Sequence, residues 1–177
     1  MKKNYIKRFL TKLIVFIYFL LNPITSFAEI GDKQWSKICN ANKQCAIMIV
    51  KKNDKKQNIS TATIQLRSST KKEMALIDGE KTNKLLPVLV VKLPLNVSLK
   101  KSPLLRIDKK GVLKLPFLYC NTQDGCVASS DITDEILKLL KEGNILTVTL
   151  AVYGSKNFFN ISFPLKGFSK SYKSLLK

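Results

Sequence analysis

The chain has 177 residues, with 31 Lys and Arg against 12 Asp and Glu, and it contains no histidine. The lack of histidine excludes Ser-His-Asp and Cys-His nucleophilic sites and argues against most transition-metal sites. A formal net charge of +19 at pH 7 predicts a surface that attracts polyanions. The alternative is that a Lys-, Asn- and Ile-rich composition reflects AT-rich coding, so that the charge only keeps the protein soluble.

The first 28 residues follow the order of charged, apolar and small residues that is typical of a secretory signal. Five basic residues precede the apolar run Leu13–Leu21, Pro23 follows it, and Ser26-Phe27-Ala28 supplies small residues at the cleavage positions. The run is shorter than the ~20 residues that a helix needs to cross a bilayer. We therefore expect export through the Sec pathway and cleavage after Ala28. An uncleaved amphipathic anchor is the alternative.

Removal of residues 1–28 leaves 149 residues, 29–177, which suits one domain with a single core. Without the five basic residues of the signal, 26 remain against 12 acidic ones, a net charge of +14. The expected partners are an envelope protein or an anionic envelope surface such as lipopolysaccharide, phospholipid headgroups or an acidic glycan. We expect no nucleic acid, because the chain is exported and has no RNP-type aromatics, finger spacing or basic zipper.

The remaining chain contains four cysteines, Cys39, Cys45, Cys120 and Cys126, an even number for an oxidising compartment. Five residues separate the members of each pair, and each pair lies where a strand turns back. A short reversal brings the two ends within disulfide distance, which favours Cys39–Cys45 and Cys120–Cys126; bonds that join the two hairpins are the alternative. A structural zinc site usually has C-x2-C or histidine ligands, and a redox pair usually has the spacing C-x-x-C. Neither pattern occurs here, so we expect structural disulfides.

Short strands separated by turns dominate the chain after Trp35. Apolar and polar residues alternate in 61–66 and 112–115, as in a half-buried antiparallel sheet. Strands of this length and spacing predict an all-β, two-sheet antiparallel β-sandwich. The predicted strands are 44–51, 59–67, 73–77, 85–93, 97–99, 104–107, 112–120, 145–153 and 157–164.

Two short helices are predicted, at 131–142 and at the C-terminal 167–176. Asp131 is the expected N-cap of the first helix and Gly143 its end. The second helix is expected to dock on the sandwich through one apolar side; a helix lying on a membrane surface is the alternative. That apolar side consists of Phe168, Tyr172, Leu175 and Leu176.

Basic residues concentrate between residues 92 and 114, with Asp108 as the only acid. Folded as a hairpin pair, they would line one edge or end of the sandwich as a candidate anion-binding face. The alternative is that they protect an exposed sheet edge against aggregation. The seven residues are Lys92, Lys100, Lys101, Arg106, Lys109, Lys110 and Lys114.

Nothing in the sequence predicts catalysis, a metal site or a cofactor. The chain has no Gly-rich phosphate loop. Glycoside hydrolysis needs a pair of convergent carboxylates, and the nearest cluster, Glu73, Asp78 and Glu80, is typical of a solvated hairpin end. We therefore interpret the protein as a non-enzyme that acts by binding.

The order of several short motifs resembles the invasion-associated locus B family of alphaproteobacterial envelope proteins. The resemblance covers nearly all of the chain after the signal, although Asn96 stands where the family commonly has glycine. The motifs are Trp35 with Ile38-Cys39 and Cys45, 91–97 (VKLPLNV), 106–108 (RID), 115–117 (LPF) with Cys120, 125–128 (GCVA) and 164–168 (PLKGF).

The resemblance implies an immunoglobulin-like β-sandwich that is exported to the periplasm or outer envelope. No activity or active site is established for the family, so the resemblance supplies no catalytic residue. Two alternatives stay open beside an envelope-binding role. One is a surface-displayed or secreted virulence factor that engages the host-cell surface, and the other is a structural or chaperone-like envelope protein.

Overall fold

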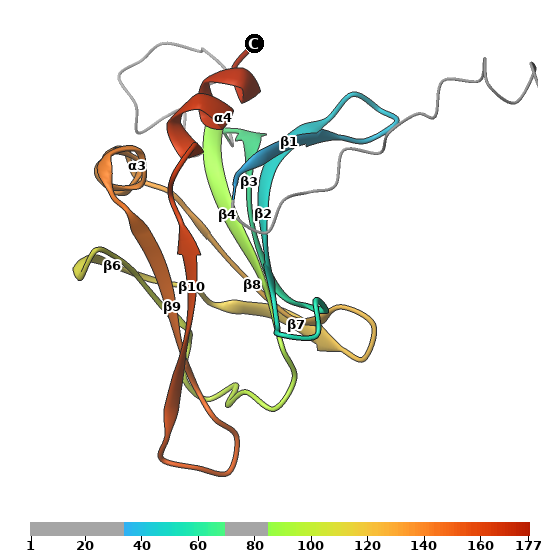
Figure 1. The fold of residues 1–177 in the computed structure, drawn as a ribbon, viewed down its shortest axis with the longest axis vertical. Helices are drawn as coiled ribbons and strands as arrows, with labels where there is room; N and C mark the ends of the chain where they lie inside the picture. The colour runs from blue at the N-terminus through green and yellow to red at the C-terminus, as the bar shows by residue number, and fades with distance from the viewer. Residues whose placement is uncertain (1–33, 70–84) are drawn as a thin grey trace, which may run out of the picture.

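Two antiparallel β-sheets form the body of the protein in the computed structural model, which describes residues 34–69 and 85–177 (Figure 1). One sheet has six strands in the order β1-β2-β3-β4-β8-β7, and the other has four in the order β10-β9-β5-β6. Their inner faces share one hydrophobic core. The predicted two-sheet antiparallel β-sandwich is confirmed.

The observed strand bounds agree with most of the strands predicted from the sequence pattern. The six-stranded sheet contains β1 (Ser36–Cys39), β2 (Cys45–Lys52), β3 (Asn58–Ser68), β4 (Leu85–Leu93), β7 (Phe117–Asn121) and β8 (Gly125–Asp131). The four-stranded sheet contains β5 (Leu104–Ile107), β6 (Lys110–Lys114), β9 (Ile145–Ala151) and β10 (Phe158–Pro164). Predicted strands 85–93 and 104–107 have the observed bounds, and four others agree within two residues at each end.

The predicted strand 112–120 is wrong, because this stretch forms two strands in different sheets. β6 ends at Lys114, and β7 begins at Phe117 on the edge of the six-stranded sheet. Between them, Leu115 is fully buried and its N–H donates to the carbonyl of Pro103. Pro116 has no N–H to continue a ladder, so the chain leaves one sheet there and enters the other.

Two further predictions differ from the structure. Of the predicted strand 97–99, only Val97 pairs, through an isolated bridge to Val152. Neither β1 nor β8 is among the predicted strands. The predicted signal 1–28, the predicted strand 73–77 and the acidic cluster of Glu73, Asp78 and Glu80 lie outside the described residues.

Alternate residues of both sheets point into the core, as the period of a strand requires. In β3, Ala62 and Ile64 have no exposed surface, whereas Gln65 is exposed. Fully buried side chains of the four-stranded sheet meet those of the six-stranded one. The largest of them are Ile47, Ile49, Ile64, Leu89, Leu93, Leu105, Ile107, Leu146 and Phe163.

Helix α3 (Asp134–Glu142) begins three residues later than predicted, because Asp131 is not its cap. Thr133 is the N-cap, and its hydroxyl accepts from the N–H of Ile136 at 3.3 Å. Asp131 instead ends β8, where its two carboxylate oxygens accept from Arg67 at 2.9 and 2.7 Å. Gly143 ends the helix as predicted.

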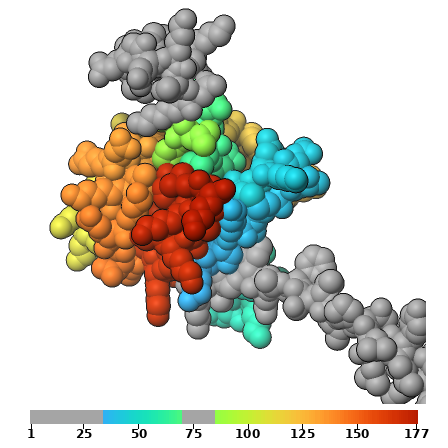
Figure 2. Space-filling model, turned by 90° about the horizontal axis from the view of Figure 1, so that it is seen from above, coloured from blue at the N-terminus to red at the C-terminus, as the bar shows by residue number. Residues whose placement is uncertain are grey.

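Helix α4 (Phe168–Leu175) docks on the sandwich as predicted. Phe168 has no exposed surface; its ring meets Trp35 edge to face at 5.0 Å and stacks with Tyr172 at 5.9 Å between centroids. The Trp35 indole donates to the carbonyl of Pro164 at 3.0 Å. Leu176 lies outside this contact and is 58% exposed. Figure 2 shows α4, in red, covering the end of the sandwich beside the first strands, in blue.

Candidate functional site

Both predicted disulfides are present. Cys39–Cys45 and Cys120–Cys126 each join residues that face one another across a hairpin, with the Cα atoms 4.0 Å apart. The hairpins are β1–β2 and β7–β8, and β1 and β7 are the two edge strands of the six-stranded sheet. The bonds therefore fasten both edges of this sheet to their inner neighbours.

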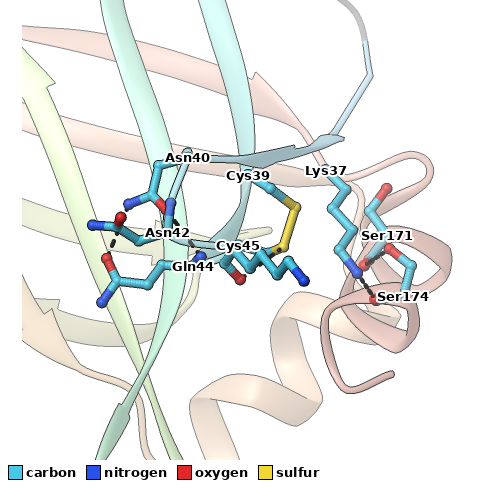
Figure 3. The surroundings of a disulfide bond; sticks show 9 residues. Lys37, Cys39, Asn40, Asn42, Gln44, Cys45, Ser171 and Ser174 are labelled. Carbon is cyan, nitrogen blue, oxygen red and sulfur yellow. Dashed lines mark hydrogen bonds between the residues drawn. A yellow bond between two sulfur atoms is a disulfide. The ribbon is translucent and has the colours of Figure 1, made fainter.

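An asparagine organises the turn inside each disulfide, in a shared Cys-Asn-x4-Cys pattern that the sequence interpretation did not use. Asn40 accepts at Oδ1 from the N–H groups of Asn42 and Gln44 at 3.0 and 2.9 Å (Figure 3). Asn121 accepts in the same way from residues 123 and 124. Asparagine is favoured at such turns because its side chain bonds the local backbone. These cysteines and asparagines are structural.

The seven basic residues of the candidate anion-binding face do not share one surface, so the predicted geometry is wrong. Lys92 lies on the outside of the six-stranded sheet, where its ammonium is 2.7 Å from a carboxylate oxygen of Asp124. The hydrogen bonds from Lys92 and Asn121 lower the pKa of Asp124. Lys92 thus belongs to a local ion pair on the other sheet.

The other six basic residues are divided among three places along the four-stranded sheet. Arg106 and Lys114 are exposed on its outer face. Lys109 and Lys110 lie at the β5–β6 turn, next to α3. Lys100 and Lys101 lie in the segment 94–103, which joins the two sheets at the end opposite the helices (Figure 1).

The outer face of the four-stranded sheet is polar and internally hydrogen-bonded. The Thr149 hydroxyl donates to Asn160 at 2.7 Å, and the hydroxyls of Thr147 and Ser162 are 3.2 Å apart. Arg106 lies opposite Thr147 in the register. These polar side chains are therefore already hydrogen-bonded within the sheet, and Arg106 and Lys114 are exposed on the same face.

The structure brings Lys100 and Lys101 together with a second segment, the β9–β10 turn. The N–H of Ser98 donates to the carbonyl of Ala151 at 2.8 Å, and that of Tyr153 donates to the carbonyl of Asn96 at 3.0 Å. Asn96 has φ +68°, a left-handed angle in which asparagine is enriched among non-glycine residues. We name the surface formed by residues 94–103 and 152–158 the loop end.

Cationic and aromatic side chains lie next to each other on the loop end. The ammonium of Lys101 is 5.1 Å from the centroid of the Phe158 ring, a cation–π distance. Lys100 and Lys156 are exposed beside them, as is Tyr153. The sequence interpretation missed Tyr153, Lys156 and Phe158; their signal was an aromatic residue on each side of the Gly154-Ser155 turn.

The acidic residues lie mainly at the opposite end of the molecule. Of the seven in the described ranges, five are near α3, and neither segment of the loop end contains an acid. The remaining two are Asp54 in the β2–β3 turn and Asp124, which is paired with Lys92. The two segments of the loop end therefore contain three lysines and no acid of their own. The five acids near α3 are Asp108, Asp131, Asp134, Glu135 and Glu142.

Two hollows lie in the surface of the described residues. One of about 950 Å³ lies along the β1–β2 hairpin, and another of about 500 Å³ lies between β4 and the two helices. Across residues 34–69 and 85–177, no three Cys, Asp or Glu side chains are placed to hold a metal ion. In the same ranges, no helix has the length and apolar character of a membrane span.

Asp108, the acid within the basic stretch, is structural and should make stability depend on pH. It accepts from the N–H groups of Asn144 at 2.7 Å and Ile145 at 2.9 Å, and these bonds lower the pKa of Asp108. A carboxyl with a lowered folded pKa stabilises the protein above its unfolded pKa, about 3.9, and loses this effect as the pH falls through the folded value.

We expect Asp108→Asn to lower the Tm at pH 7, and the difference from the wild type to shrink below about pH 4. Thermal unfolding followed by circular dichroism between pH 2 and pH 8 checks this. Asp54→Asn, at an exposed turn, is the matched control and should change the Tm little. A constant difference between Asp108→Asn and the wild type over the whole pH range would contradict the assignment.

Comparisons with known proteins agree with the fold. A family model described as "Invasion associated locus B (IalB) protein" matches residues 35–176. A crystal structure of invasion associated protein B from Bartonella henselae is similar, with a TM-score of 0.67 and 19% identity, over 82% of this chain and 94% of that one. No curated protein gives a significant match. Since the family model spans most of the sequence, the chain belongs to the invasion-associated locus B family.

Proposed function

We propose that this protein is an exported, non-enzymatic member of the family that binds an anionic surface of the cell envelope through the loop end. The observation that carries the proposal is the distribution of charge. The two segments of the loop end contain the three lysines Lys100, Lys101 and Lys156 and no acid. Most of the acids in the described residues lie beside α3. A cluster of lysines of this kind concentrates polyanions and steers their approach.

The chemistry of the ligand follows from this surface. Lysine is a compact point charge on a flexible stem, which suits repeated phosphate or carboxylate groups better than one shaped anion. Lipopolysaccharide, phospholipid headgroups and acidic glycans all present such groups in high density. The predicted signal and the two disulfides support a periplasmic or outer-membrane-associated location.

Neutralising the three loop-end lysines tests the proposal. A lysine near an anionic surface contributes about 1 kcal/mol, so the triple change Lys100→Gln, Lys101→Gln, Lys156→Gln should weaken binding to lipopolysaccharide or anionic vesicles roughly 100-fold. Raising the salt concentration from 50 to 500 mM should also weaken binding of the wild type, because salt screens the charges. Co-sedimentation at each salt concentration measures both effects.

The matched control is Lys109→Gln, Lys110→Gln, Lys114→Gln, which removes the same charge from β6 and its turn. It should leave the affinity within a few-fold of the wild type. If both triple variants lose the same affinity, binding follows net charge, and the loop end is not the site.

A host-facing role is the second candidate, and the family description, which includes the words "invasion associated", favours it. Anionic glycans on a host-cell surface would meet the same lysines. Surface labelling of intact bacteria, together with a host-cell binding assay, separates this role from a periplasmic one. A structural or chaperone-like role would instead give many different crosslinked partners in living cells.

A further inference from the structure

We propose that the loop end inserts apolar side chains into the interface of an anionic phospholipid bilayer, so that its ligand is a membrane surface rather than a soluble polyanion. This inference rests on the proposed function, since it names the anionic surface. It draws on a separate observation, the large apolar side chains that the same two segments expose.

Four large apolar side chains protrude from the loop end. Tyr153 is 75% exposed, Leu99 59%, Phe158 58% and Leu95 45%. Single exposed apolar residues are normal on a protein surface. Here all four belong to the two segments of the loop end, which contain three lysines and no acid and lie at one end of the molecule (Figure 1). Such grouping marks an interaction site.

The backbone presents these side chains in a fixed arrangement. The two hydrogen bonds between the segments and the Val97–Val152 bridge hold them together, with Val97 buried beneath. Within the β9–β10 turn, the N–H of Val152 donates to the carbonyl of Asn157, and the Ser155 hydroxyl accepts from the N–H of Asn157. An ordered turn can insert its side chains without first losing conformational freedom.

The combination of residue types matches the bilayer interface. Aromatic rings, tyrosine above all, are enriched at the level of the headgroups, because the ring is apolar and the hydroxyl stays wet. Lysines beside them meet the phosphates of anionic lipids. A soluble polyanion would engage the lysines and leave the four apolar side chains in water, so it would use only the charged part of this surface.

Tryptophan fluorescence tests insertion directly. Tyr153→Trp places an indole on the loop end, and the native Trp35 is 4% exposed near α4 and gives a constant background. On addition of phosphatidylglycerol vesicles, the emission of this variant should shift to the blue, and brominated lipids should quench it. Tyr119→Trp is the matched control, since Tyr119 is 48% exposed on the edge strand β7, and it should show neither effect.

A second set of variants separates lipid insertion from charge. Tyr153→Ser, Phe158→Ser should reduce partition into phosphatidylglycerol vesicles at least 10-fold and leave retention on soluble heparin unchanged. Leu118→Ser, Tyr119→Ser on β7 should change neither, and the Tm of each variant verifies that it is folded. The lysine-to-glutamine triple variant of the loop end should lose both kinds of binding.

The outcomes distinguish this inference from the proposed function. If Tyr153→Trp binds the vesicles without a blue shift or quenching, insertion is overturned and the anion-binding function stands. Equal loss of heparin and vesicle binding in Tyr153→Ser, Phe158→Ser would likewise overturn insertion. If the wild type binds neither vesicles nor soluble polyanions, both proposals fail.

Discussion

Replacing Phe168 with alanine should lower the free energy of unfolding by about 3 to 5 kcal/mol, as removal of a buried aromatic side chain typically does. The ring has no exposed surface and contacts both Trp35 and Tyr172. Its loss would leave a cavity between α4 and the first strand, and the paired aromatic contacts would be lost as well. Urea unfolding measures the change, which should correspond to a fall in Tm of roughly 6 to 20 °C.

Phe158→Ala is the matched control, because it removes the same atoms from a side chain that is 58% exposed. We expect a change of only about 0.5 kcal/mol there. If Phe168→Ala lowers the free energy of unfolding as little as Phe158→Ala does, α4 is not docked in solution and the contact with Trp35 contributes little to stability.

Removing either disulfide should cost about 2 to 2.5 kcal/mol, the chain-entropy value for a loop of seven residues. Cys39→Ser, Cys45→Ser frees the edge strand β1, and Cys120→Ser, Cys126→Ser frees the edge strand β7. Because four strands separate the two edges, the effects should add in the quadruple variant to about 4 to 5 kcal/mol. Denaturant unfolding of the three variants measures the losses.

Reduction provides the control for these serine variants. Dithiothreitol should lower the stability of the wild type by about as much as the quadruple substitution, and it should leave the quadruple variant unchanged. Mass mapping under non-reducing conditions should find each bond within its own hairpin. A peptide that joins Cys39 or Cys45 to either of the other two cysteines would contradict the pairing.

Local patterns in the sequence predicted those parts of the fold that local physics determines. Alternation located β3, and the five-residue gap predicted both disulfides, because a tight reversal brings such residues together. The stretch 112–120 was read as one strand because its apolar pattern continues through Pro116, and only packing against both sheets divides it. β8 was missed because Ala128, Ser129 and Ser130 lack the branched and aromatic side chains that mark strands.

The candidate site was harder to predict because charges that are close in the sequence need not be close in space. Lys92 and Lys114 lie only 22 positions apart, but they belong to different sheets. The loop end combines Lys101 with Phe158, and nothing in the spacing of these two residues indicates a contact. The N-cap of α3 was also ambiguous, since Asp131 and Thr133 are both good caps. Asp131 is instead bound by a residue far away in the sequence, Arg67.

The contact between the beginning and the end of the described fold has a consequence for synthesis. Trp35 and Ser171 are 136 positions apart, yet the serine hydroxyl donates to the tryptophan carbonyl at 2.8 Å. Until α4 has been synthesised, the first strand lacks the helix that covers it. Such a long-range contact forms slowly compared with a hairpin, so we expect α4 to dock after the hairpins have formed.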